Sequence, residues 1–345
     1  MPRRIAPGFF SRIALLFLWL ASTGHSALAA APFYEGKTIR VVVGTSPGGG
    51  YDTYTRVIAR HFGKHIPGNP VVIVDNMPGA GGLVSANYLY KVAKPDGLTI
   101  GHFVGGQFLQ QLLARPGIEF DAHKFEYIGV PAQDDFVLGI AKTTGISSVE
   151  QWMAAKTTVK FGAISPGDGT YDTAKVVEAA LGLPIQIVSG YKGTAPIRLA
   201  FNSGEVAGLS NSWQSFRSTW RKELESGEAA IVLQLGAKPH PDLPKVPLAV
   251  TFAKTDAARK LIQAVAQAHG AAVRPYLLAP GTPKDRVEIL RKAFMETVKD
   301  PDLLSEAAKA NLEINPGSGE DLERNVRDLL RLEPAVVERL KDILK

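Results

Sequence analysis

The fold of this protein is decided by residues 39–53, which read IRVVVGTSPGGGYDT. Residues 39–43 are mostly β-branched and apolar, which predicts a buried strand. A glycine loop follows at 44–50. Beyond it, the spacing of apolar side chains predicts one face of a helix over 52–65, at Tyr54, Val57, Ile58 and Phe62. This order of strand, glycine loop and helix predicts an α/β unit.

The same order repeats through residue 103. We predict strands at 71–74 and 98–103, a second glycine loop at 78–82 and a helix over 83–93. Short strands that alternate with helices are typical of a doubly wound, mostly parallel sheet flanked by helices. Ligand sites in such sheets lie at the carboxyl ends of the strands, where both glycine loops fall.

A second unit begins near Phe136 and contains an echo of the first. Residues 165–173 read SPGDGTYDT and match SPGGGYDT at 46–53 with one inserted residue. We predict that this copy also follows a strand, at 159–164, and opens a helix, over 173–181. The alternative is chance, helped by the general preference for Ser, Gly and Asp before helices. We interpret the echo as two lobes of one architecture.

The rest of the second unit continues the alternation, and the last hundred residues are poor in strands. The predicted elements are a strand at 185–188, a glycine loop at 190–193, a helix over 196–202, a strand at 206–210, a strand at 274–278 and helices from there to Lys345. A helical tail with one returning strand usually packs back on an earlier domain. The charge-rich segments 254–260 and 320–345 are interpreted as solvated helix faces.

The N-terminal thirty residues have the pattern of a secretory signal. Arg3, Arg4 and Arg12 precede or flank an apolar run at 13–21, and Ala27-Leu28-Ala29 offers a cleavage site. The apolar run is too short to span a bilayer, although a membrane anchor is the alternative interpretation. We therefore expect a chain exported to the periplasm and cleaved near Ala29.

Composition excludes several classes of function. The 345 residues contain no Cys, so a disulfide scaffold, a thiolate metal site and a thiol nucleophile are excluded. The formal charge is +6, but the predicted signal holds three Arg and no acidic residue. The mature chain then has 36 Lys and Arg against 33 Asp and Glu, a charge of +3. That charge is scattered, which argues against a nucleic-acid partner.

Known glycine motifs do not account for these loops. The dinucleotide pattern GxGxxG fails because residues 53 and 84 are not Gly, and the phosphate-loop pattern before Lys37 fails because residue 31 is Ala. Residues 44–48 fit the GxSxG elbow of serine hydrolases, with Ser46 as nucleophile. The residue after that serine must donate its N–H to the oxyanion, and Pro47 has none. A secreted serine hydrolase using Ser46 stays as an alternative.

Isolated histidines and one tryptophan are weaker candidates. His61 and His65 are spaced i, i+4 but lack a third metal ligand, so we interpret them as a solvated helix end and predict no metal site. His102 ends a predicted strand at the expected cleft edge. Trp213 follows a predicted strand and either floors a site or packs in the core.

The glycine loops are best suited to anion capture. The first turn of a helix has unpaired N–H groups and a partial positive charge, and glycines let a ligand approach that backbone. Two lobes with facing loops can close on a small anion between them. The alternative is that the loops are ordinary tight turns.

Five segments resemble one family in order along the mature chain. They are PGGGYD at 47–52, NMPGAGG at 76–82, PDGLT at 95–99, PDLPKVP at 241–247 and APGTP at 279–283. This combination resembles the Bug family, the periplasmic substrate-binding proteins of tripartite tricarboxylate transporters. The resemblance implies a two-lobe, type II Venus-flytrap fold, with residues 32–131 and 251–345 in one lobe and 132–250 in the other.

The resemblance also implies a function and a site. Family members hold a carboxylate through backbone groups of the glycine loops, often with bridging waters, and present it to membrane subunits. Bulky Tyr51 and His102 depart from the expected pattern and would reshape the pocket. The expected ligand-binding residues are Pro47, Gly48, Gly49, Gly50, Tyr51, Asp52, Gly79, Ala80, Gly81, Gly82, His102, Ser165, Gly167, Asp168, Gly169, Thr170, Tyr171, Gly193 and Trp213.

These observations predict a non-enzymatic solute-binding protein. We expect a small organic carboxylate as ligand, no cofactor, a monomer, and the membrane subunits of a tripartite tricarboxylate-type transporter as partner. The same fold as the ligand sensor of a two-component system is a further alternative.

Overall fold

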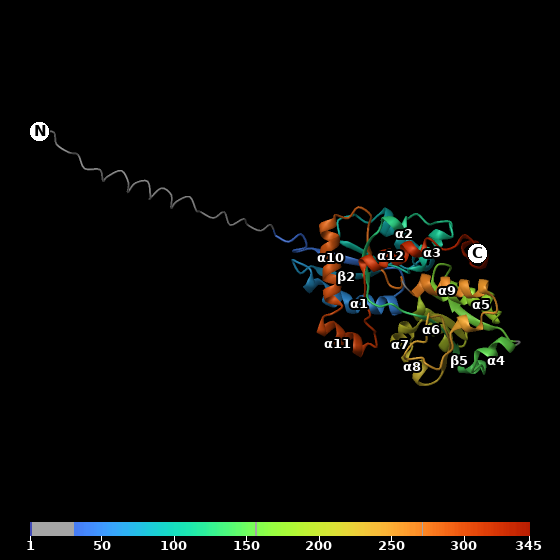
Figure 1. Cartoon of the computed structure of the whole chain (residues 1–345). Helices are drawn as coiled ribbons and strands as arrows, with labels where there is room; N and C mark the ends of the chain where they lie inside the picture. The colour runs from blue at the N-terminus through green and yellow to red at the C-terminus, as the bar shows by residue number, and fades with distance from the viewer. Residues whose placement is uncertain (2–30, 156, 271) are drawn as a thin grey trace. The chain divides into compact units, whose positions relative to one another are not determined.

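Strand β1 (Thr38–Val43) lies inside a six-stranded sheet with the order β11-β4-β10-β3-β1-β2. The computed structural model describes residues 1, 31–155, 157–270 and 272–345 (Figure 1), so the predicted signal peptide lies outside the described residues. The other strands of this sheet are β2 (Val71–Asn76), β3 (Thr99–His102), β4 (Glu126–Val130), β10 (Tyr276–Leu278) and β11 (Gly317–Ser318).

A second sheet of five strands has the order β7-β6-β8-β5-β9. Its strands are β5 (Phe136–Ala141), β6 (Val159–Ala163), β7 (Ile185–Ser189), β8 (Gly208–Ser212) and β9 (Ala229–Gln234). Three strands lie side by side in the same relative order in both sheets. They are β2, β1 and β3 in the first sheet and β7, β6 and β8 in the second. A strand from a chain crossing follows them, β10 in one sheet and β5 in the other. This shared order is the type II binding-protein topology.

The expectation of mostly parallel sheets is wrong. β1 pairs in parallel with β2 and β3, and β6 with β7 and β8. β10 is antiparallel to β3 and β4, and β5 to β8 and β9. The crossing strands enter from the opposite direction, and this makes each sheet mixed. The strand predicted at 274–278 begins only at Tyr276, because Arg274 has a positive φ of 56°.

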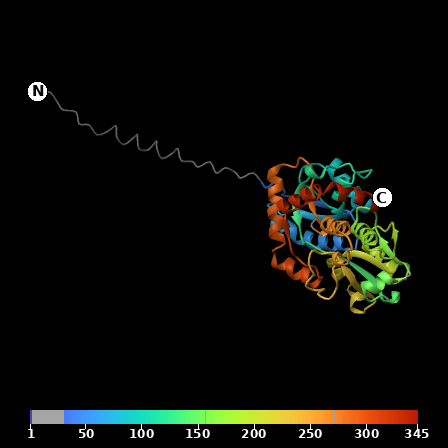
Figure 2. The ribbon, with the colours of Figure 1, turned by 45° about the vertical axis from the view of Figure 1, so that its right-hand side comes forward.

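Helices cover both faces of the two sheets (Figures 1 and 2). The helices are α1 (Gly50–Phe62), α2 (Leu83–Lys91), α3 (Gly106–Leu112), α4 (Val149–Ala154), α5 (Gly169–Leu181), α6 (Thr194–Asn202), α7 (Trp213–Thr219), α8 (Arg221–Glu225), α9 (Asp256–Gly270), α10 (Lys284–Thr297), α11 (Pro301–Lys309), α12 (Gly319–Leu329) and α13 (Pro334–Ile343). Helices α1 and α5 begin earlier than predicted, because the glycines before them already belong to the first turn.

The core follows the predicted apolar patterns. Val41, Val42 and Val43 of β1 are almost fully buried. Aromatic rings fill the space beside the first sheet, with Phe103 close to Phe108 and Phe125. Helix α9 packs against α5 and also contacts α3 and α13 (Figure 1). In the described part of the chain, no helix combines the length and apolar character needed to cross a membrane.

The helix end at His61 and His65 is not simply solvated, which corrects the sequence interpretation. His61 Nε2 lies 2.8 Å from Glu306 Oε2, and His65 Nε2 lies 2.6 Å from Asp300 Oδ2. Both acids belong to or cap α11. The two histidines therefore join α1 to the C-terminal helices, a role that the spacing of the histidines could not reveal. No group of three potential metal ligands occurs among the described residues.

Candidate functional site

The glycine loops at the carboxyl ends of the two sheets touch one another. The N–H of Ser46, after β1, donates to the carbonyl of Lys192, after β7, at 3.0 Å. Gln107 Nε2 donates to the carbonyl of Gly81 at 2.9 Å. A Cβ on Gly81 would lie 2.7 Å from Ser165 Oγ, so the second glycine loop faces the echo loop. All four predicted loops therefore meet at one interface.

The echo in sequence is also an echo in structure. Asp52 Oδ2 accepts from the N–H of Gly48 at 2.9 Å, and Asp172 Oδ1 accepts from the N–H of Gly167 at 3.0 Å. Both glycines have positive φ, 82° and 91°, which explains why glycine stands there. Each aspartate ties its loop to the helix that follows. The loop geometry is thus built twice by the same device.

The two helices differ at their N-caps. Gly49 caps α1 in an extended conformation without a side-chain hydrogen bond. Asp168 caps α5, where its Oδ1 accepts from Thr170 N at 2.8 Å and from Thr170 Oγ1 at 2.5 Å. Gly193 caps α6 and likewise supplies no side chain. The N-termini of α1 and α6 therefore keep donors for a ligand, whereas α5 is already capped by a carboxylate.

A small cavity of about 20 Å³, room for about one water molecule, lies between the loops. Five predicted site residues line it: Gly49, Gly50, Tyr51, Asp168 and Thr170. The remaining lining residues were not predicted: Thr45, Val104, Phe136, Ile164, Thr194, Asn211 and Ser215. The cavity is thus built from both sheets.

Buried polar atoms without partners gather around this cavity. Thr45 Oγ1 and Asn211 Nδ2, both on residues that line it, have no hydrogen-bond partner, and their residues are 6% and 4% exposed. Ser46 Oγ and Ser165 Oγ, in the same loops but outside the lining, are also without partners. An unpaired buried donor or acceptor costs about 1–3 kcal/mol, so a cluster of them is typical of a site that a polar ligand completes.

Asn211 is oriented by its neighbour. Its Oδ1 accepts from the N–H of Ser212 at 3.0 Å, which leaves Nδ2 as a free donor. An amide N–H, a hydroxyl and uncapped backbone N–H groups are all donors suited to a carboxylate. The sequence signal that was missed is the polar end of β8, which reads SNS at 210–212 directly after an apolar strand start.

Other predicted residues lie in the loops without lining the cavity. Pro47 and Gly48 are exposed, as is Ala80, whereas Gly79 and Gly82 shape the second loop with positive φ. Asp52 is engaged by Gly48, Arg56 and Asn76. Close packing explains the positions of four further residues. Gly167 is packed against Gln107, Gly169 against Phe136 and Gly193 against Ser46. Tyr171 packs against the hydrophobic core.

His102 and Trp213 are placed by packing. His102 is fully buried between Tyr51 and Tyr276, with ring centroids at 5.1 and 4.3 Å, and its Nδ1 lies 3.0 Å from the carbonyl of Pro275. Burial lowers the pKa of His102 to about 3, so the ring is neutral. Trp213 donates from Nε1 to Asp242 Oδ2 at 3.0 Å and packs in the second core.

Arg274 supports the cavity from behind and was missed as a functional candidate. The side chain is fully buried and donates to Asp134 Oδ2 at 2.8 Å, Ser212 Oγ at 2.7 Å and Ser215 Oγ at 3.0 Å. Its guanidinium carbon lies 4.5 Å from the ring centre of Tyr54. Arg274 thereby connects a chain crossing, α1 and the start of α7. A lone arginine in an apolar run was the available signal.

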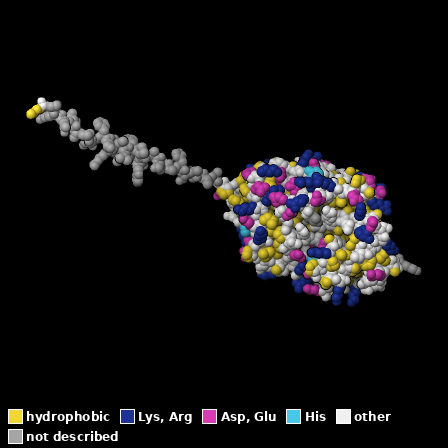
Figure 3. All heavy atoms as spheres, in the orientation of Figure 1, with side chains coloured by type: hydrophobic (Ala, Val, Ile, Leu, Met, Phe, Trp, Pro, Cys, Tyr) yellow, Lys and Arg dark blue, Asp and Glu magenta, His cyan; other side chains and the backbone are white. Residues whose placement is uncertain are grey.

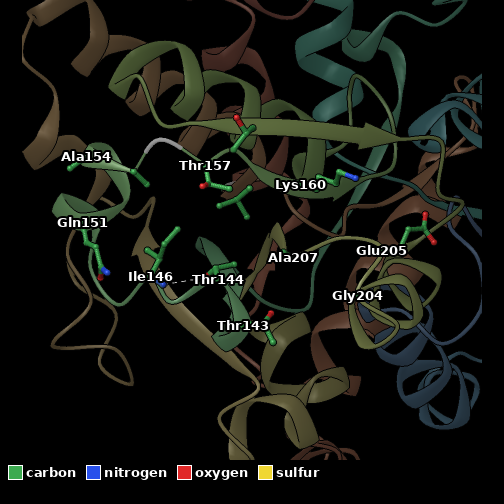
Figure 4. A pocket seen from close by; sticks show the side chains of 13 residues that line it. Thr143, Thr144, Ile146, Gln151, Ala154, Thr157, Lys160, Gly204, Glu205 and Ala207 are labelled. Carbon is green, nitrogen blue, oxygen red and sulfur yellow. Dashed lines mark hydrogen bonds between the residues drawn. The ribbon is translucent and has the colours of Figure 1, made fainter.

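Two larger pockets lie away from the facing loops. One, of about 690 Å³, is lined by Thr143, Thr144, Lys160, Glu205 and neighbours (Figure 4), all from the second sheet and its connections. The other, of about 980 Å³, runs along segments 235–242 and α9. Neither has buried unpaired polar atoms among its lining residues. On the face shown in Figure 3, Lys and Arg are mixed with Asp and Glu.

Comparison with known proteins shows the family. Residues 55–341 match the family described as the tripartite tricarboxylate transporter family receptor, TctC. The UPF0065 protein in the gbd 5' region of Cupriavidus necator is 27% identical over 338 residues, covering 93% of this chain and 94% of that protein.

Solved structures show the same fold. The periplasmic binding protein BugD has a TM-score of 0.72 and 21% identity, covering 90% of this chain and 98% of BugD. MatC of Rhodopseudomonas palustris, solved with bound malate, has a TM-score of 0.70 and 18% identity, covering 90% of this chain and 99% of MatC. The chain therefore belongs to the TctC, or Bug, family of periplasmic solute-binding proteins.

Proposed function

We propose that this protein captures a small organic carboxylate in the periplasm and presents it to the membrane subunits of a tripartite tricarboxylate-type transporter. The family, and the malate bound to the similar MatC, support this proposal. We assign residues 32–131 and 251–345 to one lobe and residues 132–250 to the other. The ligand binds between the lobes and is not chemically changed.

The observation that carries the proposal is the set of donors without partners between the two lobes. The uncapped first turn of α1 lies beside Thr45 Oγ1 and Asn211 Nδ2 in the cavity lining. A hydrogen bond to a charged group contributes about 1.5–3 kcal/mol, so two or three of them contribute about 3–9 kcal/mol, which corresponds to millimolar to micromolar affinity. A neutral ligand would gain less from the same donors.

Ligand binding requires the lobes to separate and close again. A carboxylate of several carbons exceeds the 20 Å³ between the loops. The loops must therefore stand further apart in the complex than in the arrangement described here. Closure is then driven by contacts that the ligand makes with both lobes at once.

Isothermal titration calorimetry with dicarboxylates, tricarboxylates, hydroxy acids and aromatic acids tests the proposal. We expect at least one carboxylate to bind the wild-type protein, and we expect Thr45→Val and Asn211→Ala each to weaken it about tenfold. Thr251→Val, which removes a hydroxyl on an exposed turn, is the matched control and should change nothing. Binding of a neutral sugar or a cationic amine, with no response to any carboxylate, would contradict the proposal.

The mature form and its assembly are tested separately. We propose removal of the signal peptide near Ala29 and a monomer in solution. N-terminal sequencing of protein from the periplasmic fraction checks the first statement. Sedimentation equilibrium checks the second, and a mass twice that of the mature chain would contradict it.

A further inference from the structure

We propose that Asp168 limits the ligand to carboxylates that carry a hydrogen-bond donor, an amino or hydroxy group, on the side that faces the second sheet, and that it rejects dicarboxylate dianions. This inference rests on the proposed function and names the ligand class of the same site. It assigns the selectivity to one side chain.

Asp168 brings a negative charge into the cavity wall. It is 4% exposed, and no other described residue that lines the cavity is charged. Its Oδ1 takes both hydrogen bonds from Thr170, so the carboxylate occupies the place at the start of α5 where an anion would otherwise bind. The second lobe therefore offers an acceptor at α5, not a second anion site.

The donors for a ligand carboxylate lie away from the start of α5, on α1 and Thr45 across the interface and at Asn211 Nδ2 and the start of α6. Gly49 and Gly50 open α1 without a side-chain cap, and Thr45 Oγ1 is unpaired beside them. Asp168 lies close enough across the interface to raise the pKa of the Tyr51 phenol, in addition to burial, which is the larger cause. A carboxylate held by α1 therefore turns its remaining groups toward Asp168.

Among the described residues, no cation lines the cavity to neutralise a second ligand carboxylate. Arg274 lies outside the lining, where its two terminal nitrogens donate to Asp134, Ser212 and Ser215 and only its buried Nε has no partner. His269 is not a lining residue, and its Nε2 lies 3.2 Å from Asp172 Oδ2. A ligand amino or hydroxy group can donate to Asp168, whereas a second carboxylate meets a like charge in a buried site.

The protonation state of Asp168 supports this assignment. Burial raises the pKa of Asp168 to about 6, and the hydrogen bonds from Thr170 oppose this effect. Asp168 is therefore mostly ionised at pH 7.5, where it acts as an acceptor.

Matched ligands and variants test the inference. At each length from three to six carbons, the dicarboxylate is compared with the ω-hydroxy and the ω-amino monocarboxylate by calorimetry at pH 7.5. We expect the wild-type protein to bind a donor-bearing acid at least tenfold more tightly than the dicarboxylate of the same length. Asp168→Ser and Asp168→Asn remove the charge but keep a good N-cap, and each should shift this ratio at least tenfold toward the dicarboxylate.

Asp121→Asn is the control, because Asp121 also caps a helical turn, through His123 N, but lies outside the cavity lining. It should leave the ratio unchanged. A wild-type preference for dicarboxylates, or a ratio that neither Asp168 variant moves, overturns the inference while leaving the proposed function standing. Absence of binding by every carboxylate to the wild-type protein overturns both.

Discussion

The loops at 46–53 and 165–173 share a sequence pattern, a preceding strand and an aspartate that accepts a hydrogen bond from a loop N–H. They differ in the charge of the residue that caps the following helix. At Gly49 the first helix begins with its N–H groups uncapped, and at Asp168 the equivalent helix begins under its own carboxylate. One residue thus separates an end that attracts an anion from an end that repels one. Repetition of a motif in this protein preserves geometry and not charge.

The largest effect is expected from copying the second loop into the first with Gly49→Asp. Gly49 has φ −93° and ψ 175°, which aspartate adopts readily, and the new carboxylate would cap α1. We expect carboxylate affinity to fall at least a hundredfold, about 3 kcal/mol. Gly49→Asn is the control for bulk, because any Cβ here would lie 2.8 Å from Thr194 Oγ1. Equal losses in both variants would refute the charge argument.

Asp52 and Asp172, which accept hydrogen bonds from the loop N–H groups, should differ in their contribution to stability. Asp172 is fully buried and is also bonded by Gln110 Nε2 at 3.0 Å, whereas Asp52 pairs with the half-exposed Arg56. We expect Asp172→Ala to lower the free energy of unfolding by about 3 kcal/mol and Asp52→Ala by about 1–2 kcal/mol. Urea unfolding measures both, and a larger loss for Asp52→Ala would break the comparison.

The pH dependence of Asp52 has a defined sign. Burial alone would raise the pKa of Asp52, but hydrogen bonds from Arg56, Gly48 and Asn76 lower it below its usual value. The stabilisation is therefore complete above about pH 4, where the unfolded carboxyl is ionised, and is lost as the pH falls further. The stability deficit of Asp52→Ala should shrink between pH 5 and pH 2.

Asp168 should behave in the reverse way. Its folded pKa of about 6 lies above that of the unfolded chain, so its ionisation destabilises the fold as the pH rises from 4 to 6. We expect Asp168→Asn to stabilise the protein by about 1–3 kcal/mol at pH 7.5 and by little at pH 4. The ionisable groups Tyr51, Asp172 and His269 interact with this carboxyl. The free energy of unfolding of the wild-type protein is therefore measured over the same pH series as that of Asp168→Asn. A difference independent of pH would contradict the assignment.

The smallest effects are expected at the serines that the two loops share. Ser46 and Ser165 each carry a buried, unpaired hydroxyl and do not line the cavity. Ser46→Ala and Ser165→Ala should raise the free energy of unfolding by about 0.5–1 kcal/mol and change carboxylate affinity less than threefold. Ester hydrolysis that disappears only in Ser46→Ala would instead favour the hydrolase alternative.

Local patterns predicted the βαβ strands β1, β2, β3, β6, β7 and β8 and the four loops, because glycine and apolar periodicity act over short distances, but they gave no strand for β4, β5 or β9. They did not predict the mixed sheets, since β10 and β5 are placed by chain crossings rather than by neighbours in sequence. They also missed Asn211, Ser215 and Arg274, which reach the site only through tertiary packing. The difference between Gly49 and Asp168 was visible in the sequence, but its meaning required the cap geometry.

The contact between Ser46 and Lys192 has a consequence for the ligand concentration at which the proposed site becomes half occupied. In this arrangement the loops leave room for about one water, so under the proposed function a carboxylate would bind only the fraction of molecules whose lobes are apart. The apparent dissociation constant is the intrinsic one divided by that fraction. The strength of contacts that never touch the ligand thereby sets the concentration at which the binding protein becomes half saturated.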